Sequence, residues 1–193
     1  MKKGEESRQR LIKCAAELFW QNGYSATGIS EILKHTGLPK GSFYFYFKSK
    51  DELAVAVTEF YQEFLLEQFQ TSSQGKEWEN FIKEIFDYLS RRTTGQNFSG
   101  CPYAVMGMET ALSKPKVAVV FMEGLKKLNT IFYTVLLQSG LSKTHAQILS
   151  ERLLSIYQGE LLLGRISGDI FYLENARKNM IEMYREYRTF HKI

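Results

Sequence analysis

Apolar residues recur every three or four positions along most of this chain, which is the spacing that places them on one face of an α-helix. The clearest case is the predicted helix 7–22, which Gly23 is expected to end. No segment alternates apolar and polar residues with the period of two typical of a half-buried strand. The pattern therefore predicts an all-α protein of about nine helices. The buried stripe of the first helix is predicted to be Leu11, Ile12, Ala15, Leu18 and Phe19.

Two short helices separated by a glycine turn are predicted next. Thr27 is placed to cap the first through its hydroxyl group, and Gly37 to end it in the left-handed conformation. Pro39 suits a first helical turn, so a second short helix is predicted over residues 40–46. A helix, a turn with glycine and a second helix have the spacing of a helix-turn-helix motif.

The second short helix carries ammonium, hydroxyl and phenol groups, which can hold phosphates and reach base edges in DNA. An ordinary helical hairpin with a solvated basic face has the same spacing, so the motif alone leaves both interpretations open. The groups come from Lys40, Ser42, Tyr44 and Tyr46, with Phe45 between them and Lys48 and Lys50 just beyond.

The charge distribution favours the DNA interpretation. The net charge of the chain is only +4. Residues 1–50 hold nine Lys and Arg against four Asp and Glu, whereas residues 51–193 hold sixteen against seventeen. A basic N-terminal quarter on a nearly neutral body is typical of a DNA-binding domain joined to a domain that does not touch DNA.

Residues 7–57 resemble the N-terminal domain of the TetR family of bacterial transcriptional repressors. They read SRQRLIKCAAELFWQNGYSATGISEILKHTGLPKGSFYFYFKSKDELAVAV. The resemblance implies a DNA-binding domain over 1–50, a connecting helix over 51–69, and an effector-binding and dimerisation domain over 70–193. It assigns contact with double-stranded DNA to Thr27, Lys40, Gly41, Ser42, Tyr44, Phe45, Tyr46 and Lys50.

Within this set, the resemblance implies that Thr27, Tyr44, Tyr46 and Lys50 hold the DNA backbone. Lys40 can reach guanine, and Phe45 can meet only an apolar feature such as the thymine methyl group. Alternatively, Phe45 helps to pack the small domain. Pro39, Leu33 and Phe45 depart from the usual family pattern, so the operator sequence stays open.

From Trp78 onward the pattern is helical throughout. By resemblance, the last two helices pair with their copies in a homodimer as a four-helix bundle. Two helix-turn-helix motifs related by a twofold axis would then contact a palindromic operator. The alternative is that these helices are the last core helices of a monomer. The predicted interface residues are Leu153, Tyr157, Leu161, Leu173, Met180 and Tyr184.

The middle helices supply large apolar side chains that can line a cavity for a small hydrophobic or aromatic effector, or that can simply form core. Glu109 is the one charge in an apolar helix, and is paired, solvated or turned toward a polar part of the effector. The segment beginning at Gly100 resembles LmrA/QdoR-type regulators. The predicted pocket residues are Phe86, Tyr103, Met106, Glu109, Phe121 and Phe132.

Other classes of function are disfavoured. His35, His145 and His191 are scattered, and no nucleophile, phosphate-loop or metal-ligand motif is present, so no enzyme activity, cofactor or metal is expected. No signal peptide or membrane span is expected, so the protein is predicted to be cytoplasmic. A repressor released by a ligand is the first hypothesis, and a constitutive DNA-binding protein without an effector is the alternative.

Overall fold

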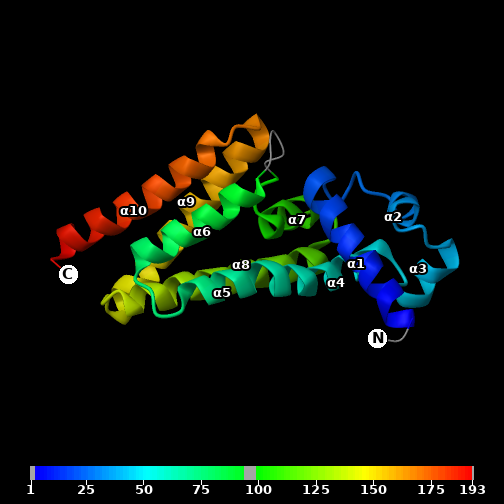
Figure 1. Ribbon diagram of the computed structural model, residues 1–193, viewed down its shortest axis with the longest axis horizontal. Coiled ribbons are helices and arrows are strands. Elements are labelled where there is room, and N and C mark those ends of the chain that lie inside the picture. The colour runs from blue at the N-terminus through cyan, green and yellow to red at the C-terminus, as the bar shows by residue number, and fades with distance from the viewer. Residues whose placement is uncertain (1–2, 94–98, 193) are drawn as a thin grey trace. The chain divides into compact units, whose positions relative to one another are not determined.

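The computed structural model describes residues 3–93 and 99–192, and every regular element in these ranges is helical (Figure 1). Helices α4 and α5 are continuous through a π-helical turn, so the described residues form nine helices, as predicted. The elements are α1 (Lys3–Asn22), α2 (Ile29–Thr36), α3 (Lys40–Tyr46), α4 (Lys50–Tyr61), the π-helical turn (Gln62–Leu66), α5 (Glu67–Ser73), α6 (Trp78–Arg92), α7 (Pro102–Thr110), α8 (Pro115–Gln138), α9 (Lys143–Ser167) and α10 (Phe171–His191).

The contacts divide the chain into two compact units, each discontinuous in sequence. Unit 1 consists of residues 1–65 and 102–124, and unit 2 of residues 66–101 and 125–193. Helix α7 and the first part of α8 therefore belong to the same unit as the helix-turn-helix. This division adds a segment to the N-terminal unit that lies far beyond residue 69 in the sequence.

Unit 1 is built around α1, which packs against α2, α3, α4 and α7 (Figure 1). The Tyr61 hydroxyl group donates a hydrogen bond to the Ala16 carbonyl at 2.7 Å and so ties α4 to α1. Gly37 ends α2 with φ of 65°, and its N–H donates to the Leu33 carbonyl, as the sequence predicted. Ser49 caps α4 by accepting from the Glu52 N–H at 3.2 Å.

Unit 2 is built around α10, which runs antiparallel to α9 and also packs on α6 (Figure 1). Trp78, at the start of α6, is fully buried, and its indole N–H donates to the Met180 carbonyl at 3.2 Å. Its ring meets Phe132 edge-on, with centroids 5.3 Å apart. Phe69, Phe81 and Tyr157 complete this aromatic core.

The π-helical turn lies where the chain passes from unit 1 to unit 2. The sequence predicted one uninterrupted helix over 51–69. The structure instead has one continuous helical path from Lys50 to Ser73 that contains five π-helical residues, Gln62–Leu66. Such turns hold one residue more than an α-helical turn, and the spacing of apolar residues alone does not show where that residue enters.

Candidate nucleic-acid interface

Helix α3 turns one side into the core and the other to solvent. Phe43 and, just beyond the helix, Phe47 are buried, with ring centroids 6.0 Å apart. On the opposite side Phe45 is 80% exposed and Tyr44 is 51% exposed. A side chain exposed to this extent adds almost nothing to a core, so the alternative that Phe45 packs the small domain is wrong. The exposed aromatic pair is held on a helix anchored by two buried rings.

The remaining predicted contacts on α3 surround this pair. Lys40 and Gly41, at the N-terminal end of the helix, are exposed, and Ser42 and Tyr46 are half-buried. The Phe45 ring meets the Tyr46 ring edge-on, with centroids 4.9 Å apart. An ammonium group, a hydroxyl group, two phenols and one apolar ring therefore share the accessible part of a single short helix. This combination suits contact with both phosphates and base edges.

Thr27 has a different role from the predicted one. Its side chain is fully buried, and its hydroxyl group donates to the Gly23 carbonyl at 2.8 Å and to the Leu18 carbonyl at 3.3 Å. The N-cap of α2 is Gly28, with no side-chain capping bond, so the prediction that the Thr27 hydroxyl group caps this helix is wrong. A phosphate contact through this buried hydroxyl group does not fit the structure, because the group is withdrawn from the surface.

Lys50 is half-buried and holds the loop between α1 and α2. Its ammonium group donates to the Tyr24 carbonyl at 2.8 Å and to the Thr27 carbonyl at 3.1 Å. The same nitrogen lies 4.1 Å from the centroid of the Tyr24 ring. Burial lowers the pKa of Lys50, while the nearby carboxylates of Asp51 and Glu109 act in the opposite direction. The two hydrogen bonds use two of the three ammonium N–H groups of Lys50.

Two arginines near the start of α1 contact the same motif. The Arg10 guanidinium donates to the Thr36 carbonyl at the end of α2. The guanidinium carbon of Arg8 lies 5.5 Å from the centroid of the Phe47 ring. A cation at the C-terminal end of a helix is favourable, so Arg10 supports α2 directly.

Glu109, predicted to line a ligand pocket, instead contacts the helix-turn-helix. Its carboxylate accepts from the backbone N–H of Ser25 at 3.0 Å. The same carboxylate lies over Gly23, which has φ of 92°. An isolated acidic residue on an apolar helix was the only sequence signal for this contact, and it does not name the partner. Of the three predicted outcomes for Glu109, pairing is the one that the structure shows.

A second polar link joins the same loop to α4 and to the start of α8. The Tyr24 hydroxyl group donates to the Asp51 carboxylate, whose other oxygen lies 2.9 Å from the Lys114 ammonium. The bond from Tyr24, and then the bond from Lys114, hold the pKa of Asp51 below its ordinary value. Burial, followed by the bond to Asp51, raises the pKa of Tyr24. The loop that precedes α2 and α3 is thus held by side chains from several elements of unit 1.

Comparison with known proteins decides the family. Residues 11–57 match the bacterial regulatory proteins of the tetR family. Residues 78–179, more than half of the chain, match the C-terminal domain of LmrA/YxaF-like transcriptional regulators. The chain belongs to the TetR family. Its C-terminal domain is of the LmrA/YxaF-like kind, so the subgroup suggested by residues 100–112 is confirmed in this form. TetR-family proteins are helix-turn-helix transcriptional regulators and not enzymes.

Individual relatives agree with this assignment. The regulator YxaF of Bacillus subtilis is 29% identical over 170 residues, which covers 85% of this chain and 87% of YxaF. The regulator LmrA of Bacillus subtilis is 26% identical over 164 residues, covering 82% and 86%. The crystal structure of reduced NemR from E. coli superposes with a TM-score of 0.78 at 22% identity, covering 92% of this chain and 96% of NemR. The last comparison concerns the fold alone.

The predicted pocket residues of this TetR-family protein are distributed over both units. In unit 1, Tyr103, Met106 and Phe121 are fully buried, and Tyr61 contacts both aromatic rings at centroid distances of 5.9 and 6.4 Å. In unit 2, Phe86 and Phe132 are buried and share contacts with the Tyr157 ring. Within each unit these side chains form core, and Glu109 faces Ser25 instead.

The residues predicted for the dimer interface are all buried inside unit 2. Their exposed fractions are at most 3%. A side chain already enclosed by its own subunit cannot form the surface that meets another subunit, so the selection of these residues was wrong. They instead pack within unit 2, where α9, α10 and α6 meet. The residues concerned are Leu153, Tyr157, Leu161, Leu173, Met180 and Tyr184.

The outer face of α9 and α10 carries a second set of apolar positions. It holds a groove of about 380 Å³ lined by residues of both helices. Gly159, which lines this groove, is exposed in mid-helix, with no atom within 4 Å of the place where a Cβ would stand. Beside it, Glu160 accepts from the Asn175 and Asn179 amides through one oxygen, while its other oxygen is buried without a hydrogen bond. The apolar lining is Ile156, Leu163 and Met183.

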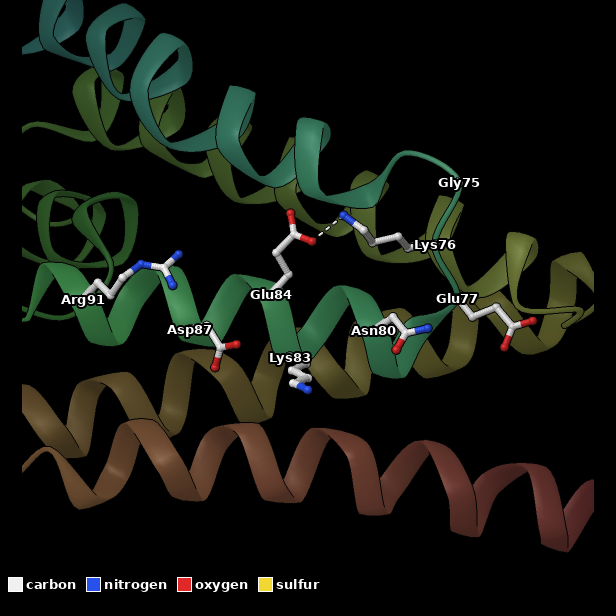
Figure 2. A pocket seen from close by; sticks show the side chains of 8 residues that line it. All are labelled: Gly75, Lys76, Glu77, Asn80, Lys83, Glu84, Asp87 and Arg91. Atoms are coloured by element: carbon white, nitrogen blue, oxygen red, sulfur yellow. Dashed lines mark hydrogen bonds and ion pairs between the residues drawn. The ribbon is translucent and has the colours of Figure 1, made fainter.

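A larger hollow of about 630 Å³ lies along α6 and the turn before it (Figure 2). Its side chains are polar, and Figure 2 shows the Lys76–Glu84 ion pair reaching from the turn to the helix. Another ion pair joins Asp87 to Arg177 at 3.6 Å. Small-molecule sites are mostly apolar with a few convergent polar groups, and this hollow has the opposite character.

Two further features bear on the expected classes of function. Within residues 3–93 and 99–192, no cluster of three or more His, Cys, Asp or Glu side chains has the geometry to hold a metal ion. Among the described helices, none is long and apolar enough to span a membrane.

Proposed function

We propose that this TetR-family regulator represses transcription by binding a palindromic DNA operator as a homodimer, with one α3 helix per subunit in the major groove. The observation that carries the proposal is the exposed Phe45 and Tyr44 pair beside Lys40, on a helix fixed by buried Phe43 and Phe47. With this burial pattern, the exposed side chains take no part in the core and are accessible to DNA. The action is proposed to take place in the cytoplasm.

Base recognition is assigned to Lys40 and Phe45. A lysine at the first turn of a recognition helix can donate to guanine O6 and N7, and an exposed phenyl ring fits the methyl group of thymine. Phosphate contacts are assigned to Tyr44, Tyr46 and the remaining N–H of Lys50, with Gly41 and Ser42 close to the backbone. Specificity then rests on two side chains per half-site, and the others mainly set affinity.

The outer face of α9 and α10 is proposed as the dimer surface, with a second copy of this chain as the partner. A glycine in mid-helix costs about 0.5–1 kcal/mol relative to alanine, and nothing within its own subunit requires one at position 159. A closely approaching partner helix would explain it. The same partner helix would cover the exposed Leu163 and the half-buried Ile156 and Met183 that line the groove.

Release by a small hydrophobic effector completes the proposal. The support is membership of the TetR family and the LmrA/YxaF-like C-terminal domain, together with the number of buried aromatic side chains. Because Tyr103, Phe121, Phe86 and Phe132 are core side chains in the present structure, an effector must rearrange part of that core. Constitutive binding without an effector is the alternative, and it predicts operator affinity that no small molecule changes.

The test begins with selection of duplexes from a random DNA library by the wild-type protein. We expect enrichment of a palindrome, bound by a dimer in analytical ultracentrifugation. Phe45→Ala should lose about 1–3 kcal/mol at one base position of each half-site. Leu112→Ala is the matched control, since Leu112 is 99% exposed but lies in the α7–α8 turn. A loss spread evenly over unrelated sequences would contradict the assignment of Phe45.

A further inference from the structure

The loop of residues 23–28 between α1 and α2 depends on side chains from other elements. Lys50, at the start of α4, donates to the carbonyl groups of Tyr24 and Thr27. Glu109, from α7, accepts from the Ser25 N–H at 3.0 Å. The loop leads directly into α2 and α3, so whatever holds it also sets where these helices begin.

Gly23 makes the contact with Glu109 possible. A Cβ atom at this position would stand 2.2 Å from one carboxylate oxygen of Glu109 and 2.8 Å from the other. Real Cβ atoms do not approach oxygen this closely, and φ of 92° at Gly23 also disfavours any other residue. A glycine and a carboxylate that lie 86 positions apart in the sequence are therefore fitted to one another.

Lys114, just before α8, provides a second support on the same side. Its ammonium lies 2.9 Å from the Asp51 carboxylate, which in turn accepts from the Tyr24 hydroxyl group. Both ends of the α7–α8 turn are thus connected to the loop, one directly and one through Asp51. Helix α7 contacts α1 and α4 within the same unit.

We infer that Glu109 is a positioning residue for DNA recognition: through Ser25 it fixes the loop that sets the arrangement of α2 and α3, without touching DNA. The inference rests on the proposed function and adds a residue outside the helix-turn-helix to it. If only a fraction of molecules has the loop in place, the apparent dissociation constant rises by the inverse of that fraction. Any event that moves α7 would act on operator affinity through the same bond.

Charge alone predicts the opposite effect. Glu109 is an acidic group in the unit that binds a polyanion, so its removal should tighten DNA binding if it acted only through its charge. As a positioning residue its removal should weaken binding. Glu109→Gln separates the two roles, because its side-chain carbonyl oxygen can still accept from Ser25 while the charge is gone.

The experiment compares Glu109→Ala, Glu109→Gln and the control Glu59→Gln, an exposed acidic residue on α4. The probe is the duplex that the wild-type protein enriches from a random library. Dissociation constants are measured by fluorescence anisotropy at several salt concentrations. Amide hydrogen exchange at Ser25, followed by NMR, reports the contact itself. Circular dichroism establishes that each variant is folded at the assay temperature.

Glu109→Ala should weaken operator binding by about tenfold or more, the effect of losing one hydrogen bond to a charged group, and should accelerate exchange at Ser25. Its salt dependence should keep the wild-type slope, because no phosphate contact is lost. Glu109→Gln should bind within about twofold of the wild type, or tighter, and keep Ser25 protected. Glu59→Gln should change neither the affinity nor the exchange.

The inference is overturned if Glu109→Ala binds as tightly as the wild type, if Ser25 exchange is unchanged, or if Glu109→Gln fails as Glu109→Ala does. If Glu109→Ala does not fold, Glu109→Asp takes its place, because it keeps the charge and draws the carboxylate back from Ser25. Weaker operator binding and faster Ser25 exchange are expected, and wild-type values would overturn the inference. Failure of the proposed function looks different, because the wild-type protein would then enrich no duplex. In that case the positioning role falls with it, and the exchange data show whether the contact exists.

Discussion

The close fit of Gly23 against Glu109 predicts a large energetic coupling between these two positions. Gly23→Ala places a methyl group where the carboxylate now lies and forces alanine into a left-handed conformation. The conformation costs about 1–2 kcal/mol. Displacing Glu109 breaks its bond to Ser25, and a hydrogen bond to a charged group contributes about 1.5–3 kcal/mol. The expected loss in the free energy of unfolding is therefore about 2.5–5 kcal/mol.

In a Glu109→Ala background the same substitution should cost only the conformational part, about 1–2 kcal/mol. The double-mutant cycle should then give a coupling of about 1.5–3 kcal/mol. Urea unfolding of all four proteins at one concentration measures it, with fluorescence from Trp20 in α1. Each protein carries Trp78→Phe, so that the signal reports unit 1 alone. A coupling below about 0.5 kcal/mol would show that the two groups do not meet, and would refute the reasoning.

Three further predictions concern other contacts. Lys50→Ala should lower the stability of unit 1, since two loop carbonyl groups lose a donor. It should also reduce the slope of log DNA affinity against log salt concentration by about one, and an unchanged slope would exclude a phosphate contact. Gly159→Leu should raise the dimer dissociation constant on the order of tenfold or more, because the larger side chain overpacks the outer face of α9 and α10 while helicity is retained. An unchanged sedimentation profile would place the dimer surface elsewhere. Asp51 has a lowered pKa, so its stabilising effect is present above about pH 4 and is lost as the pH falls through its folded-state pKa. Asp51→Asn should lower the unfolding free energy by under about 1 kcal/mol at neutral pH, because the Asp51–Lys114 pair is partly exposed. This difference should vanish in acid, and a difference that persists at pH 2 would contradict the prediction.

The sequence predicted the helix-turn-helix well because its signals are local. A left-handed glycine at position 37 has the same meaning in any fold, and α2 ends there as the pattern predicted. The fate of Thr27 was not local. A hydroxyl residue before a helix can cap it or turn back into the preceding loop, and only the packed position of α1 decides between these outcomes.

Helix α9 illustrates a second limit. It has two apolar faces, one containing Leu153 and Tyr157 and the other containing Ile156 and Leu163. Helical spacing identifies both faces but does not say which is covered by the same subunit. The sequence-based interface residues were taken from the inner face. Glu109 was missed as a contact of the reading helices for a related reason, because its partner is a backbone N–H and leaves no mark on the pattern of side chains.

The discontinuity of unit 1 bears on the construction of hybrid regulators. A simple design would join the first fifty residues of one protein to the C-terminal domain of another, which treats the DNA-binding domain as independent of the rest of the chain. Here that cut would leave Ser25 without its acceptor, because Glu109 comes from residues 102–124, and it would also leave the Tyr24 hydroxyl group without Asp51. A hybrid that is to recognise the same operator should take residues 1–65 and 102–124 from the same parent. The smallest transferable DNA-binding unit of this protein therefore consists of two separate segments of the chain.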